Sequence, residues 1–369
     1  MIERVGGIGT GALVSLLMAG LSIIGGCQFR QAEATSDLVA SDQDRLIARL
    51  RRLPTVKSVA PWQLPEGITD RSSPGLNIST AHYDIYTSLT DPLILMQVPV
   101  FLESAFRSYS QVIDYAVMSR EKLPVYFFDT RDQWEDYTRD WTGPAAPVYL
   151  KIRSGAYYFK GRCVAYHLGR RSNFAVLAHE GWHQFSDRFF YYRLPAWLDE
   201  GLATNFEAYR NANGRVTFAP PTNGSRLLAL QEALAQDRMM ALSEIITLDA
   251  GRILSHAPVG ANGGTIDPTI SAYYAQLYAL IRFLREEGFG QRRAAFRELL
   301  NDAYRGRWAL DAAARAQAIN KKRNPSRRWN AEVGQRLFQS YIAADIDAIE
   351  PAYQMFCRKI VSRLQISPH

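Results

Sequence analysis

Cysteine and histidine are both scarce in this chain. Its 369 residues include three Cys and six His, so at most one disulfide can form within the chain, and a metal site has few imidazoles to draw on. Low-complexity tracts are also few, and 47% of the residues are hydrophobic against 21% charged. This composition argues against a disordered chain and is typical of a globular protein with a large core. We expect one compact unit of two subdomains.

An uncharged apolar run occupies the N-terminus. It extends from Val5 to Gly26 behind Arg4, and such a run is typical of an export signal or a membrane anchor rather than of a core. Its end, SIIGGC, resembles a bacterial lipoprotein signal in which Cys27 is lipidated after cleavage. An uncleaved anchor over residues 1–26 is the alternative. Both interpretations predict an extracytoplasmic protein of the bacterial cell envelope, held to the membrane through its N-terminus.

The other two cysteines allow two interpretations. If Cys27 carries lipid, Cys163 and Cys357 remain as one potential disulfide in an oxidising compartment. Two buried thiols are the alternative.

The charge balance is basic. Lys and Arg number 43 against 36 Asp and Glu, a net charge of +7. This excess suits anionic lipids and envelope polymers, and it also suits nucleic acid. If the protein is exported, it does not meet cytoplasmic nucleic acid, so we expect no nucleic acid to bind.

Residues 27–79 are predicted to tether the anchor to the main domain. They are mostly polar, with a basic helix expected at 42–54 and a Pro/Gly/Ser-rich stretch from Pro61 to Ser79. The helix carries an apolar stripe, so it either rests on the membrane surface, docks on the body or stays solvated.

From residue 80 the pattern becomes regular and predicts alternating strands and helices up to 188. The expected strands are HYDIYTSL, PVYFFDT, PVYLKI, GAYYFKG and CVAYHL, and the expected helices are residues 92–113, capped by Asp91, and 131–141. Residues 189–369 read as mainly helical. The fold class is therefore α+β, with a small mixed β-sheet followed by a helical C-terminal subdomain, the two together forming one domain over 80–369.

The most informative stretch is NFAVLAHEGWHQF at 173–185, expected to be a helix with Ser172 as its N-cap. Positions four apart share one face of a helix, so His179 and His183 can hold one metal ion. Glu180 lies beside them in the order H-E-x-x-H. In metallopeptidases the two His of this motif bind Zn²⁺ and the Glu acts as general base on a metal-activated water.

A third ligand is available on the next predicted helix. The segment RLPAWLDEGLATNFEAYR places Pro195 in a first turn and Glu200 on the helix that follows. If this helix packs back on the first, the Glu200 carboxylate completes a three-ligand site and leaves a fourth position for water.

The pair HEGWHQF and PAWLDEGLA resembles the glutamate-liganded zincins, or gluzincins, the peptidase MA-like clan of thermolysin and the M1 aminopeptidases. The likeness is closest to the DUF1570-type family of exported bacterial proteins, through GAYY at 155–158, both helices and AYYAQLYALIRFL at 272–284. It covers roughly residues 80–300. It implies a zincin-like fold with one zinc ion, and says almost nothing about substrate.

The chain departs from this pattern in two ways. The spacing between His183 and Glu200 is shorter than in thermolysin-like enzymes, which tightens the turn between the helices. Where thermolysin has an Asp that orients a ligand His, this chain has Thr204. Asn205 or Asp199 could supply that hydrogen bond instead.

Four tyrosines are candidates for substrate binding or catalysis. A free sheet edge beside the motif helix could take an extended peptide, with Tyr157, Tyr158 or the 163–167 segment as contacts. Core packing is the alternative for each tyrosine. In the wider zincin group a Tyr or His beyond the ligand helix donates to the oxyanion. Tyr274, with its neighbour Tyr273, is the candidate here, and core packing is again the alternative.

The remaining features carry less weight. Residues 250–269 are rich in Gly, Ala and Pro and form either an ordinary surface loop or a lid. We expect His82, His167 and His256 not to be ligands. The basic cluster at 320–329 is expected to be a solvated surface.

We therefore predict a membrane-anchored zinc metallopeptidase that hydrolyses peptide or protein substrates, with His179, His183 and Glu200 as ligands and Glu180 as general base. No amine-binding motif of the aminopeptidase type is present, so exopeptidase action has no support. The competing hypothesis is a non-catalytic envelope lipoprotein with a structural zinc site that binds peptides or acts as a scaffold. Zinc hydrolysis of a non-peptide amide is a third, weaker alternative.

Overall fold

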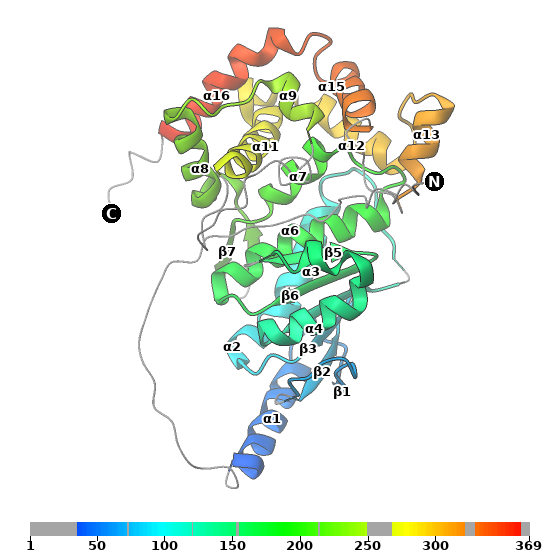
Figure 1. Ribbon diagram of the computed structural model, residues 1–369, viewed down its shortest axis with the longest axis vertical. Coiled ribbons are helices and arrows are strands. Elements are labelled where there is room, and N and C mark those ends of the chain that lie inside the picture. Colours follow the sequence, from blue (N-terminus) through cyan, green and yellow to red (C-terminus); the bar gives the residue numbers. More distant parts are fainter. Residues whose placement is uncertain are drawn as a thin grey trace, which may run out of the picture.

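The computed structural model places a mixed sheet in the lower half of the molecule and a group of helices above it (Figure 1). The structure describes residues 35–71, 74–119, 121–152, 155–212, 215–248, 268–321 and 329–362. The predicted N-terminal signal with Cys27, nearly all of the loop at 250–269 with His256, and most of the basic cluster at 320–329 lie outside these ranges. Among the described residues no helix is long and apolar enough to cross a membrane.

The sheet has six strands in the order β1-β2-β3-β4-β6-β5. Their bounds are β1 Ser58–Trp62, β2 Gly75–Ser79, β3 Tyr83–Thr87, β4 Leu123–Phe128, β5 Ala156–Phe159 and β6 Arg162–Tyr166. β4 runs parallel to both β3 and β6, and the other three pairings are antiparallel. In β3, Tyr83, Ile85 and Thr87 are buried and alternate with partly exposed residues, as expected for a strand with one face on the core. The predicted α+β class with a mixed sheet is confirmed.

The segment predicted as a tether supplies two of these strands. Val59 of β1 and Ile78 of β2 are buried in the core, and the Pro- and Gly-rich residues between them connect an antiparallel pair. The helix before them, α1 (Thr35–Arg51), docks on the body through Leu46 and Leu50, which are also buried. The tether interpretation is therefore wrong for these described residues, because their few apolar side chains suffice to fill a sheet face.

Two other local predictions differ from the structure. The helix expected over 92–113 is divided into α2 (Pro92–Leu95) and α3 (Val98–Ser110), although Asp91 does cap α2 by accepting from the Leu93 N–H at 2.8 Å. The strand expected at PVYLKI is instead the short helix α5 (Ala146–Tyr149). A short apolar run cannot be assigned to strand or helix from periodicity alone, and here a proline in the first turn favours the helix. The helix expected at 131–141 is present as α4 (Arg131–Thr142).

Two consecutive helices carry the H-E-x-x-H motif and the PAWLDEGLA segment. α6 (Arg170–Phe189) begins after Gly169 rather than after Ser172, and α7 (Ala196–Asn205) begins after Pro195. The N–H groups in the first turn of a helix have no partner within the helix. At the start of α7, Asn330 Oδ1 accepts a hydrogen bond from the Ala196 N–H at 3.0 Å and secures this end of the helix.

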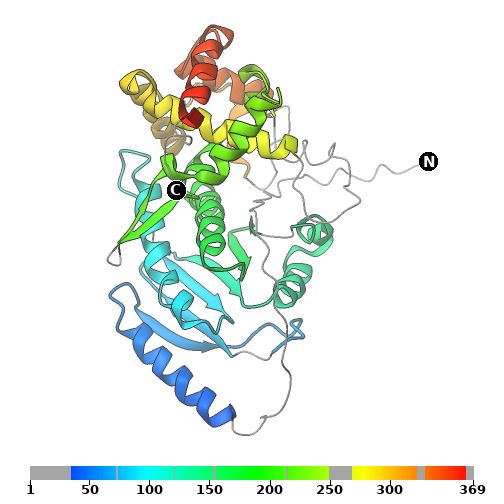
Figure 2. The same ribbon diagram turned by 90° about the vertical axis from the view of Figure 1, so that its left-hand side faces the viewer.

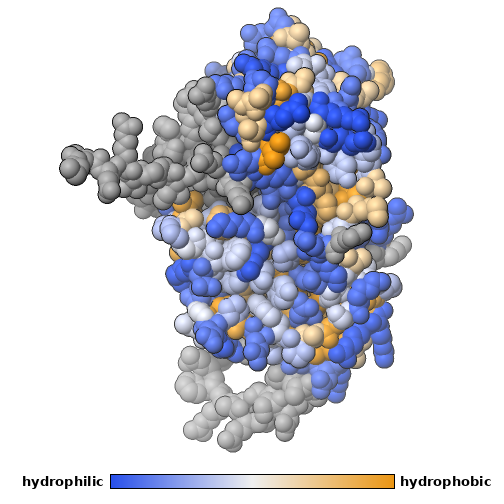
Figure 3. Space-filling model, turned by 90° about the vertical axis from the view of Figure 1, so that its right-hand side faces the viewer, coloured by the Kyte–Doolittle hydropathy of each residue, from blue (hydrophilic) through white to orange (hydrophobic). Residues whose placement is uncertain are grey.

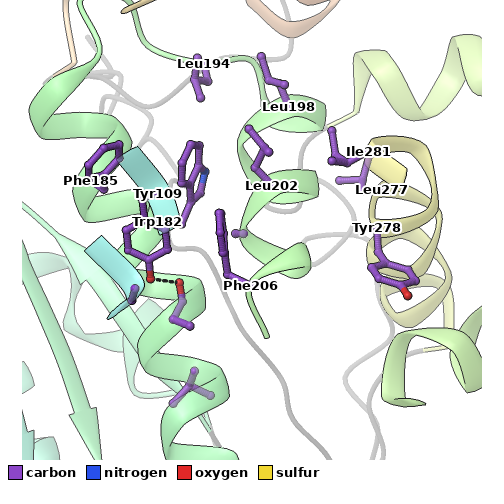
Figure 4. Packing of buried hydrophobic residues seen from close by; sticks show 14 of the residues in the cluster. Tyr109, Trp182, Phe185, Leu194, Leu198, Leu202, Phe206, Leu277, Tyr278 and Ile281 are labelled. Atoms are coloured by element: carbon purple, nitrogen blue, oxygen red, sulfur yellow. Dashed lines mark hydrogen bonds between the residues drawn. The ribbon is translucent and has the colours of Figure 1, made fainter. Parts of the chain in front are cut away.

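α7 lies between α6 and α11 (Pro268–Glu286), with Leu198, Leu202 and Phe206 directed into the packed core (Figure 4). The approach of α7 to α11 depends on Gly201, since a Cβ there would lie 2.6 Å from Ile281 Cγ1. The glycine next to Glu200 therefore lets the two helices touch, and this contact fixes the position of the Glu200 carboxylate.

The rest of the chain after α7 is mainly helical, as predicted, and its helices are gathered above the sheet (Figure 2). A two-stranded hairpin, which the sequence did not predict, leads into them. The other described elements after α7 are β7 Tyr209–Ala212, β8 Arg215–Phe218, α8 Gly224–Ala235, α9 Leu242–Thr247, α12 Arg293–Arg305, α13 Ala312–Ile319, α15 Gln335–Tyr341 and α16 Glu350–Ser362. The short 3-10 helices of the described chain are η1 Gly143–Ala145, η2 Pro220–Thr222, η3 Glu287–Gly290 and η5 Asp347–Ile349, and η4 Asn330–Gly334 is a short π-helix.

The two described cysteines are separate thiols. Cys163 lies in β6 and Cys357 in α16, both are buried, and neither forms a disulfide. Of the two interpretations, the structure supports two buried thiols, because the two residues belong to elements in different halves of the molecule (Figure 1). Burial raises the pKa of both thiols, so both stay protonated and unreactive.

Candidate metal centre

Three ligand atoms meet where α6 and α7 face each other. Glu200 Oε2 lies 3.4 Å from His179 Nε2 and 3.6 Å from His183 Nε2, and all three ligand atoms lie within 4.8 Å of one another. A tetrahedral zinc ion with bonds of about 2.0 Å separates its ligand atoms by roughly 3.3 Å. The three side chains can therefore hold one metal ion with little movement.

The inward-facing atoms of this group have no hydrogen-bond partner. His179 Nε2, His183 Nε2 and Glu200 Oε2 are all buried and unsatisfied, and the three residues are at most 4% exposed. Buried polar atoms without partners are costly and rare in folded proteins. Three such atoms converging on one point fit a bound cation, which would satisfy all of them at once.

The outward-facing nitrogens of both imidazoles are held by carboxylates. His183 Nδ1 lies 3.0 Å from Asp199 Oδ2, and His179 Nδ1 lies 2.9 Å from Glu207 Oε1. A carboxylate at Nδ1 fixes the tautomer that presents Nε2 to a metal and strengthens the imidazole as a ligand. Trp182 Nε1 also donates to Asp199, at 2.8 Å, and keeps this carboxylate in place.

Of the residues considered for this role from the sequence, only Asp199 fills it. The hydroxyl of Thr204 and the amide of Asn205 both donate to the Gly201 carbonyl within their own helix. Glu207 was missed, because it follows the end of α7. A carboxylate two helical turns beyond Glu200 is the signal that could have identified it.

Glu207 is itself anchored by a buried arginine. Arg226 of α8 donates through Nε at 2.8 Å and through Nη2 at 2.5 Å, and Asn223 Nδ2 donates at 3.0 Å. Burial by itself raises the pKa of Glu207, but Arg226 and His179 outweigh it and lower this pKa to about 2. Glu207 is therefore a carboxylate at neutral pH.

Glu207→Gln is expected to lower the free energy of unfolding of the metal-free protein by about 3 kcal/mol at pH 7. A carboxylate with a depressed pKa stabilises the fold above its ordinary pKa of 4.5, and this stabilisation is lost as the pH falls toward 2. Urea unfolding in the presence of EDTA should therefore show a gap between wild type and variant at pH 7 that narrows below pH 4.5. The exposed Glu298→Gln is the control. A gap below about 1 kcal/mol at pH 7 would contradict the assignment.

Protonation of the ligand group competes with a metal. Burial by itself lowers the pKa of an imidazole, but the carboxylates around His179 and His183 outweigh it and raise the pKa of both. Burial likewise raises the pKa of Glu200, and the two imidazoles reverse this and lower it. A metal therefore competes with protons for the imidazoles, so metal affinity falls with falling pH.

Glu180 is buried next to this group on α6. Burial first, and then the negative charge of Glu180, raises the pKa of Tyr149 and of Cys163; for Tyr274, Glu180 is the smallest of several such contributions. These three residues come from α5, β6 and α11. The Glu180 carboxylate is therefore close enough to these three residues, and to His179, to change their pKa values electrostatically.

The two candidate tyrosines of α11, Tyr273 and Tyr274, point to different places. The Tyr274 ring lies 6.3 Å from the His179 ring, and its buried hydroxyl has no hydrogen-bond partner. Burial, followed by the charge of Glu200, raises its pKa, so the hydroxyl keeps its proton and remains a donor. The Tyr273 hydroxyl instead donates to the Leu248 carbonyl at 3.3 Å. Tyr274 faces the centre, whereas this contact draws Tyr273 away from it.

The two tyrosines of β5 also diverge, because successive side chains of a strand face opposite ways. Tyr157 is fully buried against Trp134 and donates to Thr138 Oγ1 at 3.1 Å, which supports the core alternative. Tyr158 is partly exposed and donates to the Asp187 carboxylate at the end of α6. β5 is an edge strand of the sheet and packs against α6, whereas the 163–167 segment belongs to β6, which lies between β4 and β5 and offers no free edge.

The remaining described histidines lie away from the centre. His82 stacks on Phe106 and contacts Glu103 at 2.8 Å, and His167 lies 3.9 Å from Asp129. In the part of the chain that the structure describes, the group of His179, His183 and Glu200 is the one that could hold a metal ion.

Comparison of the chain with protein-family models and with curated proteins finds no match.

Proposed function

We propose that the protein is a zinc-dependent peptidase of the zincin type. The observation that carries this proposal is the convergence of three buried, unsatisfied ligand atoms from His179, His183 and Glu200 beside the carboxylate of Glu180. Two imidazoles and one carboxylate form a ligand set that suits zinc and leaves a coordination position for water. A zinc ion bound there supplies a Lewis acid that activates water at neutral pH and polarises a carbonyl.

Each neighbouring side chain has a role in this proposal. Glu180 accepts a proton from the attacking water and passes it to the leaving amine. Asp199 and Glu207 hold the two imidazoles in the tautomer that a metal requires. The Tyr274 hydroxyl, protonated and without a partner, donates a hydrogen bond to the oxyanion that forms at the carbonyl carbon.

The edge strand β5 is the proposed place for a peptide substrate. It packs against α6, which carries His179 and Glu180. An extended peptide can add to such an edge through main-chain hydrogen bonds, so the strand rather than the Tyr157 ring supplies the contacts.

The cellular setting follows from the N-terminal sequence and remains part of the proposal. A lipidated Cys27, or an uncleaved anchor over 1–26, would hold the protein at the cell envelope. One face of the described body is mostly hydrophilic, with apolar residues scattered in small groups (Figure 3). Such a surface suits a domain that works in water beside the membrane rather than within it.

A second function is favoured by one observation. The three ligand residues are at most 4% exposed, so they present little surface to solvent. A buried zinc ion suits a structural role in a peptide-binding or scaffold protein. Glu180 argues against this alternative, because a structural site needs no general base and usually closes the fourth position with a protein ligand.

Cleavage assays on the full-length protein separate the two functions. Zinc-loaded protein should hydrolyse unfolded proteins or peptides, activity should disappear with a chelator, and added zinc should restore it. The structural role would be supported if no unfolded protein or peptide of the panel is cleaved in any condition although the full-length protein is folded and binds zinc.

A further inference from the structure

A cavity lies between the C-terminal half of α7, the end of α11 and the first turns of α12, beside the residues that follow α3. Its volume is about 390 Å³, which falls within the range of small-molecule sites. Leu202, Phe296 and Leu300 provide apolar walls, and Arg285, Arg293 and Arg297 line it with positive charge. None of these residues belongs to the metal centre.

Two of the three arginines are held in place by backbone carbonyls. Arg293 donates through Nε and Nη2 to the Arg285 carbonyl at 3.1 and 2.9 Å. Arg297 donates to the Gln111 carbonyl at 3.3 Å and pairs with the Asp114 carboxylate at 2.7 Å. Guanidinium groups fixed in this way lose little entropy when a ligand binds.

Positive charge is in excess around the cavity. The Arg285 guanidinium forms no hydrogen bond or ion pair with another described residue, and Arg293 is bound by a neutral carbonyl. Glu286, the carboxylate that lines the cavity, pairs with Arg282 at 2.7 Å. Four arginines therefore face two carboxylates, Glu286 and Asp114.

The arginines also repel one another. Loss of hydration is the main cause that lowers the pKa of Arg285, and the Glu286 carboxylate opposes it. The charges of Arg293 and Arg297 lower this pKa as well, so both lie close enough to Arg285 to disfavour its charged form. An anion placed among the three guanidinium groups would balance their charge.

We propose that this cavity binds a small phosphate monoester with an apolar body. The phosphate dianion matches the excess of two positive charges and accepts paired hydrogen bonds from guanidinium groups. The apolar body lies against Leu202, Phe296 and Leu300. This site is independent of the proposed peptidase function.

Isothermal titration of the zinc-loaded full-length protein with hexyl phosphate tests the proposal. We expect saturable binding with a dissociation constant of about 1 mM or tighter, and affinity at least tenfold higher than for inorganic phosphate or hexanoate. Inorganic phosphate lacks the apolar chain, so it tests the contribution of the apolar walls. Hexanoate keeps an apolar chain but carries a single negative charge, so it tests the contribution of the second charge. Arg285→Gln combined with Arg293→Gln should weaken binding of hexyl phosphate at least tenfold. Arg307→Gln, an exposed arginine outside the cavity, should leave it unchanged.

Arg285→Gln alone provides the test if the double variant fails to fold, because the side chain makes no hydrogen bond with described residues. We expect it to weaken binding at least fivefold with an unchanged thermal unfolding midpoint. Absence of saturable hexyl phosphate binding would overturn the proposal. So would binding that survives the arginine substitutions, as expected of an anion bound at the metal centre, and so would hexanoate binding equal to that of hexyl phosphate.

Discussion

Glu180→Gln is expected to lower the turnover of peptide cleavage by about 10²–10⁴-fold while leaving the zinc content unchanged. The amide has nearly the shape of the carboxylate but cannot accept the proton of the attacking water. Glu180 is not one of the three ligand residues, so the metal should stay. Steady-state cleavage of the best peptide substrate, with zinc measured on the same samples, checks both halves of this prediction.

The matched control for this experiment is Glu298→Gln, the same chemical change at an exposed position of α12. It should retain full activity and full zinc content. Undiminished hydrolysis by Glu180→Gln would remove Glu180 from the mechanism. Loss of zinc from that variant would instead place Glu180 among the ligands.

Glu200→Gln should weaken zinc binding by more than 100-fold, since even the outer partners of ligating histidines contribute 10–100-fold to metal affinity. The substitution removes the one negative charge among the three ligands while keeping the volume of the side chain. Competition with a chromophoric chelator at pH 7 measures the change. Because the imidazoles of this group have a raised pKa, the affinity of wild type should also fall as the pH is lowered.

Asp199→Asn provides a graded comparison for Glu200→Gln. Asp199 touches His183 Nδ1 rather than the site of the metal, so its loss should cost only about 10–100-fold. Equal effects of the two substitutions, or unchanged zinc affinity in Glu200→Gln, would be incompatible with Glu200 as a ligand.

The grouping of His179, His183 and Glu200 could be predicted from the sequence because its geometry is largely local. His179 and His183 are one helical turn apart whatever surrounds them, and Glu200 needed only the assumption that the next helix packs back. Glu207 and Arg226 could not be predicted in this way. They reach His179 only because the chain turns after α7 and brings α8 alongside, a tertiary arrangement that no local spacing encodes.

The errors in the fold have a similar origin. Val59 and Ile78 lie in a segment whose polar, Pro-rich composition suggested a tether, and only pairing with β3 turns it into part of the sheet. Tyr157 and Tyr158 are equivalent in sequence but face opposite ways on β5, so which one is buried depends on the register of the strand. The sequence could not decide between a disulfide and two thiols for Cys163 and Cys357, because their distance depends on the tertiary fold.

X-ray absorption spectroscopy at the zinc edge of the loaded wild-type protein tests the central claim most directly. We predict one zinc ion per chain, bound by two imidazole nitrogens and by oxygen donors at about 2.0–2.2 Å, with no sulfur ligand. A spectrum with a zinc–sulfur distance near 2.3 Å, a spectrum with fewer than two imidazoles, or a folded protein that retains no zinc would contradict the site formed by His179, His183 and Glu200.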